Sequence, residues 1–83
     1  MTDYEHIVIS AVRYAIGRMT YIVSLTVDYV LREIKENKLS DKCLFIIKAD
    51  IEYEEKKGNL GMECDKKEWK KLLEKIDEIM EAD

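Results

Sequence analysis

Apolar residues recur along most of the chain at the three- and four-residue intervals of an amphipathic helix, and polar residues fill the positions between them. The pattern divides into four runs, which predict helices over Asp3–Ile16, Thr20–Glu36, Ser40–Lys56 and Asp65–Met80. The chain shows no internal repeat and no linker. We therefore expect a single domain over residues 1–83 with an all-α fold, a small bundle of four helices.

The start of each run carries a residue of a type that commonly caps a helix N-terminus. The predicted N-caps are Thr2, Thr20, Ser40 and Asp65. Thr2 and Asp65 are each followed three residues later by a glutamate, which is the spacing of a capping box. These caps fix where we expect the four helices to begin.

A tight joint at Gly17–Thr20 separates the first two predicted helices. A glycine after the last helical turn can adopt the left-handed conformation that ends a helix. The joint therefore predicts that the first two helices form a hairpin or a bent pair. Because the segment Tyr21–Val27 is rich in β-branched residues, a strand is the alternative there. We favour a helix, since the apolar spacing stays in phase as far as Ile34.

The composition, 47% hydrophobic and 39% charged, is that of a globular domain. No apolar run reaches the ~18–20 residues that a membrane-spanning helix needs, and the first residues are acidic where a signal peptide would be basic. We therefore expect a cytoplasmic protein that does not bind a membrane. The net charge of −4 argues against direct binding of nucleic acid and is compatible with docking on a basic protein surface.

The residues that could carry catalysis are few. His6 is the only histidine, so a nucleophilic dyad would have to join it to Cys43 or Cys64, and no third orienting group lies at a recognisable spacing. The chain has neither a glycine-rich phosphate loop nor a nucleophile elbow. The sequence predicts a protein that is not an enzyme.

Zinc is the one cofactor that the sequence suggests. Its possible ligands are His6, Cys43, Cys64 and Asp65. The third predicted helix is roughly 24 Å long at 1.5 Å per residue. An up-down bundle would therefore place Cys43 with His6 at one pole, and Cys64 with Asp65 at the other. We favour no metal, with both thiols acting as small hydrophobes and Cys64 packing on Trp69.

Arginine and tyrosine alternate around the tight joint. The group Arg13, Tyr14, Arg18 and Tyr21 could form a guanidinium–aromatic patch that binds a partner. The alternative is structural, with Arg13 paired to a carboxylate of the second helix such as Asp28.

A second charged feature lies in the third predicted helix, where Asp50, Glu52, Glu54 and Glu55 follow one another closely. Asp50 and Glu54 are candidate partner-binding residues, because such a run could imitate a phosphate backbone and occupy a basic channel. The alternative is an ordinary solvated helix face.

Two segments carry a resemblance to known proteins. The motif RYAxGRxTY over Arg13–Tyr21 and the motif LGxxCDxxxW over Leu60–Trp69 resemble a family of small uncharacterised proteins encoded by phages and prophages of Gram-positive bacteria. Both motifs and their separation match, so the resemblance spans nearly the whole chain. Phage accessory proteins of this size, acidity and helical character include inhibitors of host immunity, some of them similar to anti-CRISPR proteins that block a type II nuclease such as Cas9.

The resemblance implies a phage-encoded, stoichiometric inhibitor of a host defence system, and in particular an anti-CRISPR-like protein that binds a Cas9-type nuclease inside the infected bacterium. The first alternative is a structural or assembly protein of the phage that forms a homo-oligomer, with a homodimer as its simplest form. The second is a protein that sequesters a small molecule, with Arg13 and Arg18 in the pocket.

Overall fold

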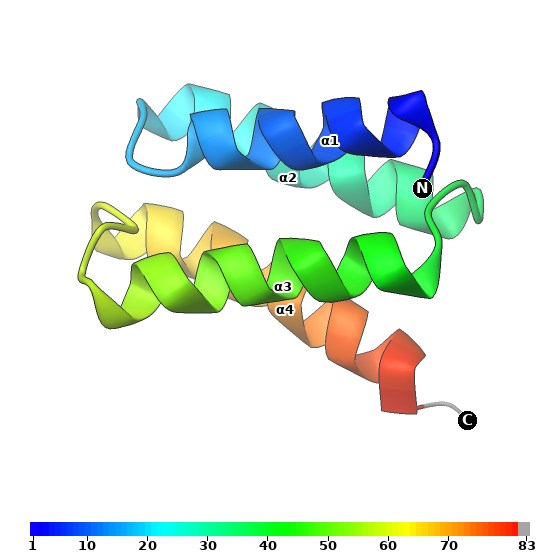
Figure 1. Ribbon diagram of the computed structural model, residues 1–83. Helices are drawn as coiled ribbons and strands as arrows, with labels where there is room; N and C mark the ends of the chain where they lie inside the picture. The colour runs from blue at the N-terminus through cyan, green and yellow to red at the C-terminus, as the bar shows by residue number, and fades with distance from the viewer. Residues whose placement is uncertain (82–83) are drawn as a thin grey trace.

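Four helices make up 79% of the computed structural model, which describes residues 1–81. Their bounds are α1 (Asp3–Ala15), α2 (Thr20–Lys35), α3 (Asp41–Lys56) and α4 (Glu63–Glu81), as Figure 1 shows. The predicted all-α bundle is confirmed. The segment 21–27 lies inside α2, so the alternative of a strand there is wrong.

Successive helices run in opposite directions, so α1 is parallel to α3 and α2 is parallel to α4 (Figure 1). α1 contacts α2 and α3, and α4 contacts the same two helices. α1 and α4 are therefore diagonal in the bundle, as are α2 and α3. This order decides which side chains meet, because α1 has α3 as a lateral neighbour even though α2 is nearer to it in sequence.

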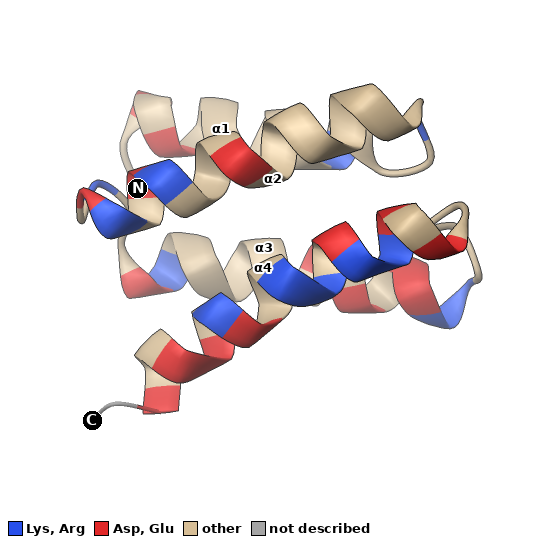
Figure 2. Cartoon of the chain, turned by 180° about the vertical axis from the view of Figure 1, so that it is seen from behind, with Lys and Arg blue, Asp and Glu red and all other residues tan. Residues whose placement is uncertain are grey.

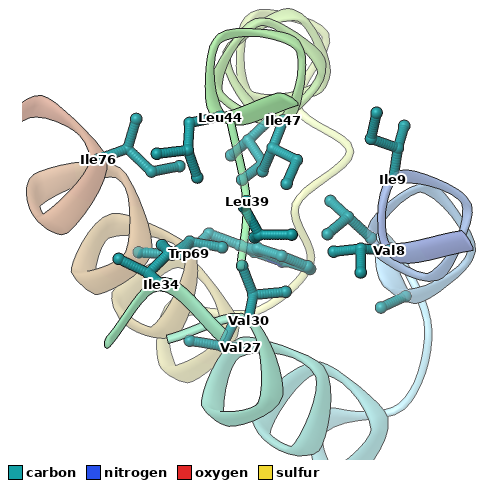
Figure 3. Close-up of a cluster of buried hydrophobic side chains, with 14 of the residues drawn as sticks. Val8, Ile9, Val27, Val30, Ile34, Leu39, Leu44, Ile47, Trp69 and Ile76 are labelled. Atoms are coloured by element: carbon teal, nitrogen blue, oxygen red, sulfur yellow. The ribbon is translucent and has the colours of Figure 1, made fainter. Parts of the chain in front are cut away.

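The core fills the space between the four apolar stripes. Figure 3 shows the Trp69 ring at its centre, surrounded by aliphatic side chains from the other helices. The fully buried large side chains are Trp69, Ile47, Ile51, Leu72, Ile76, Val8, Val12, Val23, Val27 and Val30. Every helix contributes to this one cluster, so no helix can be removed without opening it to water.

The starts of α1 and α3 are capped as the sequence predicts. The Thr2 hydroxyl accepts from the Glu5 amide at 3.1 Å, and the Thr2 amide donates to Glu5 Oε1 at 3.0 Å, which completes the capping box. The Ser40 hydroxyl accepts from the Cys43 amide at 3.2 Å. These local bonds satisfy backbone amides that have no partner inside a helix.

Thr20 is not the cap of α2, contrary to the prediction. It is the first helical residue, and Met19 is the N-cap with no side-chain hydrogen bond. Gly17 ends α1 in the left-handed conformation (φ +79°) as expected, and the chain then needs only two more residues to turn. The Met19 carbonyl accepts from the Ile22 and Val23 amides at 2.9 and 3.1 Å, so the backbone starts the helix one residue early.

The start of α4 is also predicted wrongly. α4 begins at Glu63, two residues before the expected cap, so the expected box between Asp65 and Glu68 does not form. Asp65 lies within the first turn, and its Oδ2 accepts from the Met62 amide at 3.4 Å. The carboxylate therefore caps the helix from inside, and burial of Asp65 keeps it there.

Gly61 is held close to this internal cap. Its φ is +91°, and a Cβ atom added there would lie 2.7 Å from Asp65 Oδ2. Gly58 also has a positive φ (+74°), but a Cβ atom there would meet open space. Both glycines therefore have a positive φ that disfavours other residues, but only at Gly61 would an added Cβ atom also collide with Asp65.

We expect Gly61→Ala to lower the free energy of unfolding by about 1 kcal/mol more than Gly58→Ala does, because only Gly61→Ala also displaces the Asp65 cap. Urea denaturation of the two variants and the parent measures the difference. Equal losses for both glycines would contradict a role for the contact with Asp65.

Candidate protein-binding surface

A recess of about 390 Å³ opens between α1 and α3, at the end of the bundle where α1 turns into α2. Its lining residues are Arg13, Ile16, Asp50, Tyr53 and Glu54. The lining combines two carboxylates and a guanidinium with an aromatic ring and an aliphatic side chain. Such a mixed concave surface can receive a protruding side chain of another molecule.

An ion pair crosses the recess. Arg13 Nε donates to Asp50 Oδ2 at 2.7 Å, and the arginine is the more exposed of the two partners. The structural alternative is therefore right that Arg13 forms an ion pair and wrong that the carboxylate is Asp28. The reason is the order of packing, because Arg13 leaves α1 on the side that faces α3.

Tyr53 and Glu54 complete the recess from α3. The Tyr53 ring is exposed, and the Lys57 ammonium lies 4.9 Å from its centroid. Glu54 is half-buried and its Oε2 accepts from Asn59 Nδ2 at 2.9 Å. These contacts orient both side chains without covering the ring.

The other predicted residues lie outside the recess. Tyr14 and Arg18 form their own unit, in which the Arg18 guanidinium lies 4.5 Å from the centre of the Tyr14 ring. Arg18 Nε also donates to the Tyr14 carbonyl at 3.1 Å, which satisfies a carbonyl at the end of α1. Tyr21 is exposed in the first turn of α2. The structure therefore separates the predicted arginine–tyrosine patch into distinct parts.

The acidic run of α3 does not form one row. Asp50 and Glu54 are one helical turn apart and line the recess together, while Glu52 and Glu55 are exposed and do not line it. Asp50 is moreover neutralised by Arg13. Only part of the run therefore faces the candidate surface.

Sequence reasoning missed Ile16 and Tyr53 as members of this surface. Tyr53 is three residues after Asp50 and one before Glu54, so helical spacing could have grouped the three. Ile16 likewise follows Arg13 by three residues, but only the packing of α1 against α3 brings this pair to the same recess as the residues of α3.

The four possible metal ligands divide between the poles of the bundle. α1 and α3, which carry His6 and Cys43, begin at one pole (Figure 1). Cys64 is at the other, with its Sγ 3.8 Å from Thr20 Oγ1. Within residues 1–81, no three or more histidine, cysteine, aspartate or glutamate side chains are grouped so as to hold a metal ion.

The two thiols differ in their surroundings. Cys43 is buried as expected, and burial, with a smaller contribution from the Glu5 charge, raises the pKa of its thiol to about 11. At neutral pH that thiol stays protonated and is a weak nucleophile and ligand. Cys64 is exposed, so the expectation that it packs on Trp69 as a small hydrophobe is wrong. With α4 starting at Glu63, Cys64 lies in the first turn and faces away from the core.

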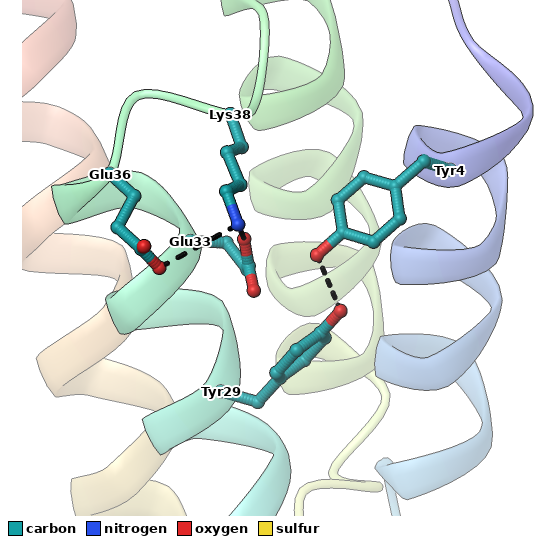
Figure 4. A network of polar contacts seen from close by, with 5 residues as sticks. All are labelled: Tyr4, Tyr29, Glu33, Glu36 and Lys38. Atoms are coloured by element: carbon teal, nitrogen blue, oxygen red, sulfur yellow. Dashed lines mark hydrogen bonds and ion pairs between the residues drawn. The ribbon is translucent and has the colours of Figure 1, made fainter.

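A polar network lies at the pole opposite the recess (Figure 4). The Tyr4 and Tyr29 hydroxyls are 2.5 Å apart and join α1 to α2, and this bond raises the pKa of Tyr4 above its usual value. Lys38 lies 3.6 Å from the buried Glu33 and 3.8 Å from Glu36. The network ties the end of α2 to its neighbours, and we assign it a structural role.

Comparisons of the chain with protein-family models, with curated proteins and with solved structures found no match. Among the helices of residues 1–81, none is both long enough and apolar enough to cross a bilayer. What the chain does must therefore be inferred from its surface.

Proposed function

We propose that this chain is a stoichiometric, non-enzymatic inhibitor that binds another protein through the recess between α1 and α3 and so blocks a working surface of that protein. The single observation that carries the proposal is the composition of the recess. An exposed tyrosine and an arginine lie beside a concave, partly apolar floor, and these are the residue types that dominate binding energy in protein interfaces.

The class of partner follows from the charge and from the resemblance. The net charge of −4 and the presence of Asp50 and Glu54 in the recess favour a partner with a basic surface. The resemblance of the segments 13–21 and 60–69 to phage and prophage proteins favours a host defence system as the target. We therefore propose a phage-encoded, anti-CRISPR-like protein that binds a Cas9-type nuclease in the cytoplasm of the infected bacterium.

A cleavage assay tests this directly. The purified protein, in excess over a guide-loaded Cas9-type nuclease of a Gram-positive host, should reduce both cleavage of a target duplex and loading of the nuclease onto DNA. Because the proposed mechanism is occupancy, inhibition should saturate at a fixed molar ratio and should weaken as salt is raised. Unchanged cleavage and unchanged loading at excess would refute the proposed target.

Removing the arginine of the recess separates binding from stability. Because the ion pair of Arg13 with Asp50 is largely exposed, Arg13→Ala should change the free energy of unfolding by less than about 1 kcal/mol. The same change should weaken inhibition by tenfold or more, as should Tyr53→Ala, if these side chains are interface anchors.

The matched control for these variants is Lys70→Ala, which removes one exposed positive charge from α4. It should inhibit as the parent does. If Lys70→Ala and Arg13→Ala weakened inhibition equally, overall charge and not the recess would carry the interaction.

A further inference from the structure

The size of the recess between α1 and α3 limits what can enter it. Its volume of about 390 Å³ is at the low end of the roughly 300–1,000 Å³ of small-ligand sites, so it suits one long side chain and not a helix of a partner. Its lining includes Ile16, which is half-buried, and the Tyr53 ring, which is 60% exposed. An occupant with an apolar stem can lie against these two residues.

The charged residues that line the recess leave one carboxylate without a cation. Arg13 and Asp50 form an ion pair at 2.7 Å and so offset each other. Glu54 Oε2 accepts from the neutral Asn59 amide group at 2.9 Å, and no lysine or arginine of residues 1–81 forms an ion pair with Glu54. Glu54 is therefore the group of the recess that can still accept hydrogen bonds from a charged donor.

The backbone adds negative potential at the same place. α1 and α3 are parallel, and the residues that line the recess belong to the end of α1 and to the last two turns of α3. Each helix C-terminus carries about half of a negative elementary charge. Figure 2 shows acidic residues concentrated in the second half of α3, just before the lysines at its end. These sources of negative potential favour a cation in the recess over an anion.

The Tyr53 ring already has a cation over one of its faces. The Lys57 ammonium lies 4.9 Å from the ring centroid, and Lys57 is exposed and forms no ion pair with a described residue. The contact shows that the ring is placed where it attracts a cation. Because such contacts are weak at exposed sites, an incoming group with more partners can displace the lysine.

Arginine fits this combination of groups better than other side chains. A guanidinium group is planar, stacks on an aromatic ring and donates two parallel hydrogen bonds to one carboxylate, whereas an ammonium group is compact and strongly hydrated. Tyr53 and Glu54 are consecutive in α3 and both line the recess, so a ring and a carboxylate are offered together. An aliphatic occupant would shield Glu54 from water without replacing its hydrogen bonds, which is unfavourable.

We propose that the recess binds an arginine side chain of the partner protein. The stem of that arginine packs on Ile16, and its guanidinium group lies against the Tyr53 ring and donates to Glu54. The proposal rests on the proposed function in taking the recess as the binding surface, and it adds the residue type that the recess recognises. Lys57 gives up its place over the ring, while Arg13 keeps its bond to Asp50.

Nuclear magnetic resonance of the ¹⁵N-labelled chain tests the site without a partner protein. N-acetyl-arginine methylamide at constant ionic strength should shift the amides around the recess, with a dissociation constant on the order of 1–10 mM. The lysine analogue should bind about threefold more weakly or worse, and the glutamate and leucine analogues should cause no saturable shift there.

Three results of this titration would overturn the inference. They are no saturable shift with the arginine analogue up to about 100 mM, equal binding of the arginine and lysine analogues, and tighter binding of the glutamate or leucine analogue.

Two charge variants should change the affinity in opposite directions. Glu54→Gln keeps the size of the side chain and removes its charge, so it should weaken binding of the arginine analogue about fivefold or more. Lys57→Gln removes the competing ammonium group and should tighten binding about twofold. The matched controls are Glu55→Gln and Lys56→Gln, which change exposed neighbours outside the recess and should bind as the parent does. Equal weakening by Glu54→Gln and Glu55→Gln would mean that overall charge attracts the probe, and would overturn the inference.

A second pair of variants tests the ring. Tyr53→Phe keeps the aromatic face and should bind the arginine analogue as the parent does, whereas Tyr53→Leu should weaken binding about threefold or more. Circular dichroism checks that both variants are folded, and the exposure of the side chain predicts that they are. Unchanged binding by a folded Tyr53→Leu would overturn the proposed stacking.

The two proposals can fail separately. If the chain inhibits the nuclease but does not bind the arginine analogue, the proposed function stands and the choice of arginine is wrong. If the analogue binds in the recess and the nuclease is not inhibited, the arginine site stands and the nuclease is the wrong target. If both hold, Glu54→Gln should weaken inhibition and Glu55→Gln should not.

Discussion

Trp69→Ala should lower the free energy of unfolding by about 3–5 kcal/mol. The ring is fully buried at the centre of the one core cluster and is its largest side chain. Truncation removes apolar burial and also leaves a cavity that the surrounding valines and isoleucines can fill only in part. Because small domains have total stabilities of about 5–15 kcal/mol, this change should leave much of the population unfolded near 37 °C. Thermal and urea unfolding followed by circular dichroism measure the loss.

Two variants control for other consequences of this change. The Trp69 Nε1 proton has no hydrogen-bond partner among the described residues, so Trp69→Phe gives up packing volume but no hydrogen bond. Its loss of stability should be less than half that of Trp69→Ala. Tyr53→Ala removes an exposed ring and should change stability little. A nearly unchanged melting temperature for Trp69→Ala would contradict the central position of the ring.

The features of this fold that could be predicted from sequence are those set by neighbouring residues. The apolar spacing identified all four helices. Each helix buries one face in the core, and the apolar residues of that face recur in the sequence at helical intervals. The caps at Thr2 and Ser40 were also predictable, since each is a contact between a side chain and an amide three residues on.

The starts of α2 and α4 were predicted wrongly for a common reason. At both positions the sequence offers a residue of capping type, but that residue is already helical: α2 begins at Thr20 itself, and α4 begins two residues before Asp65. At Met19 the chain reversal after Gly17 sets the start, and at Met62 burial of Asp65 does so. Contacts with other parts of the fold decide where such helices begin, and the local preferences of the residues do not predict those contacts.

The candidate surface was predictable only in its parts. Arg13, Asp50 and Glu54 were each identified by residue type, but α1 and α3 become neighbours only in the folded bundle. The structural alternative therefore pairs Arg13 with Asp28, which lies on the next helix along the chain. In the fold Arg13 pairs instead with Asp50 of α3. The division of the arginine–tyrosine patch between two sides of α1 likewise depends on which neighbour each side faces.

Glu5 shows how a local motif acquires a long-range role. Its Oε1 accepts from the Thr2 amide at 3.0 Å, which the capping box predicts. Its Oε2 accepts from the Ser40 amide at 2.7 Å and from the Ser40 hydroxyl at 2.6 Å. One carboxylate therefore joins the N-cap of α1 to the N-cap of α3, and almost no part of it is exposed to water.

These bonds make the stability of the chain depend on pH. The hydroxyl and amide of Ser40, followed by the Thr2 amide, lower the pKa of Glu5 from 4.5 to about 2. Because the pKa is lower in the folded state, the charged carboxylate stabilises the fold fully above pH 4.5. This contribution is lost as the pH falls from about 4.5 towards 2. Protonation weakens the bonds from the Ser40 and Thr2 donors, because a neutral carboxyl group is a poorer acceptor than a carboxylate.

Glu5→Gln should therefore lower the melting temperature by several degrees at pH 7, and the gap between variant and parent should narrow as the pH is lowered from 4.5 to 2.5. At the low end the parent approaches the neutral state that glutamine imitates, so the two curves should converge there. Thermal unfolding at half-unit pH steps measures both curves. Glu52→Gln, which changes an exposed carboxylate of α3, should follow the parent throughout. Parallel curves for Glu5→Gln and the parent down to pH 2.5 would show that the clamp between the two caps contributes no charge-dependent stability.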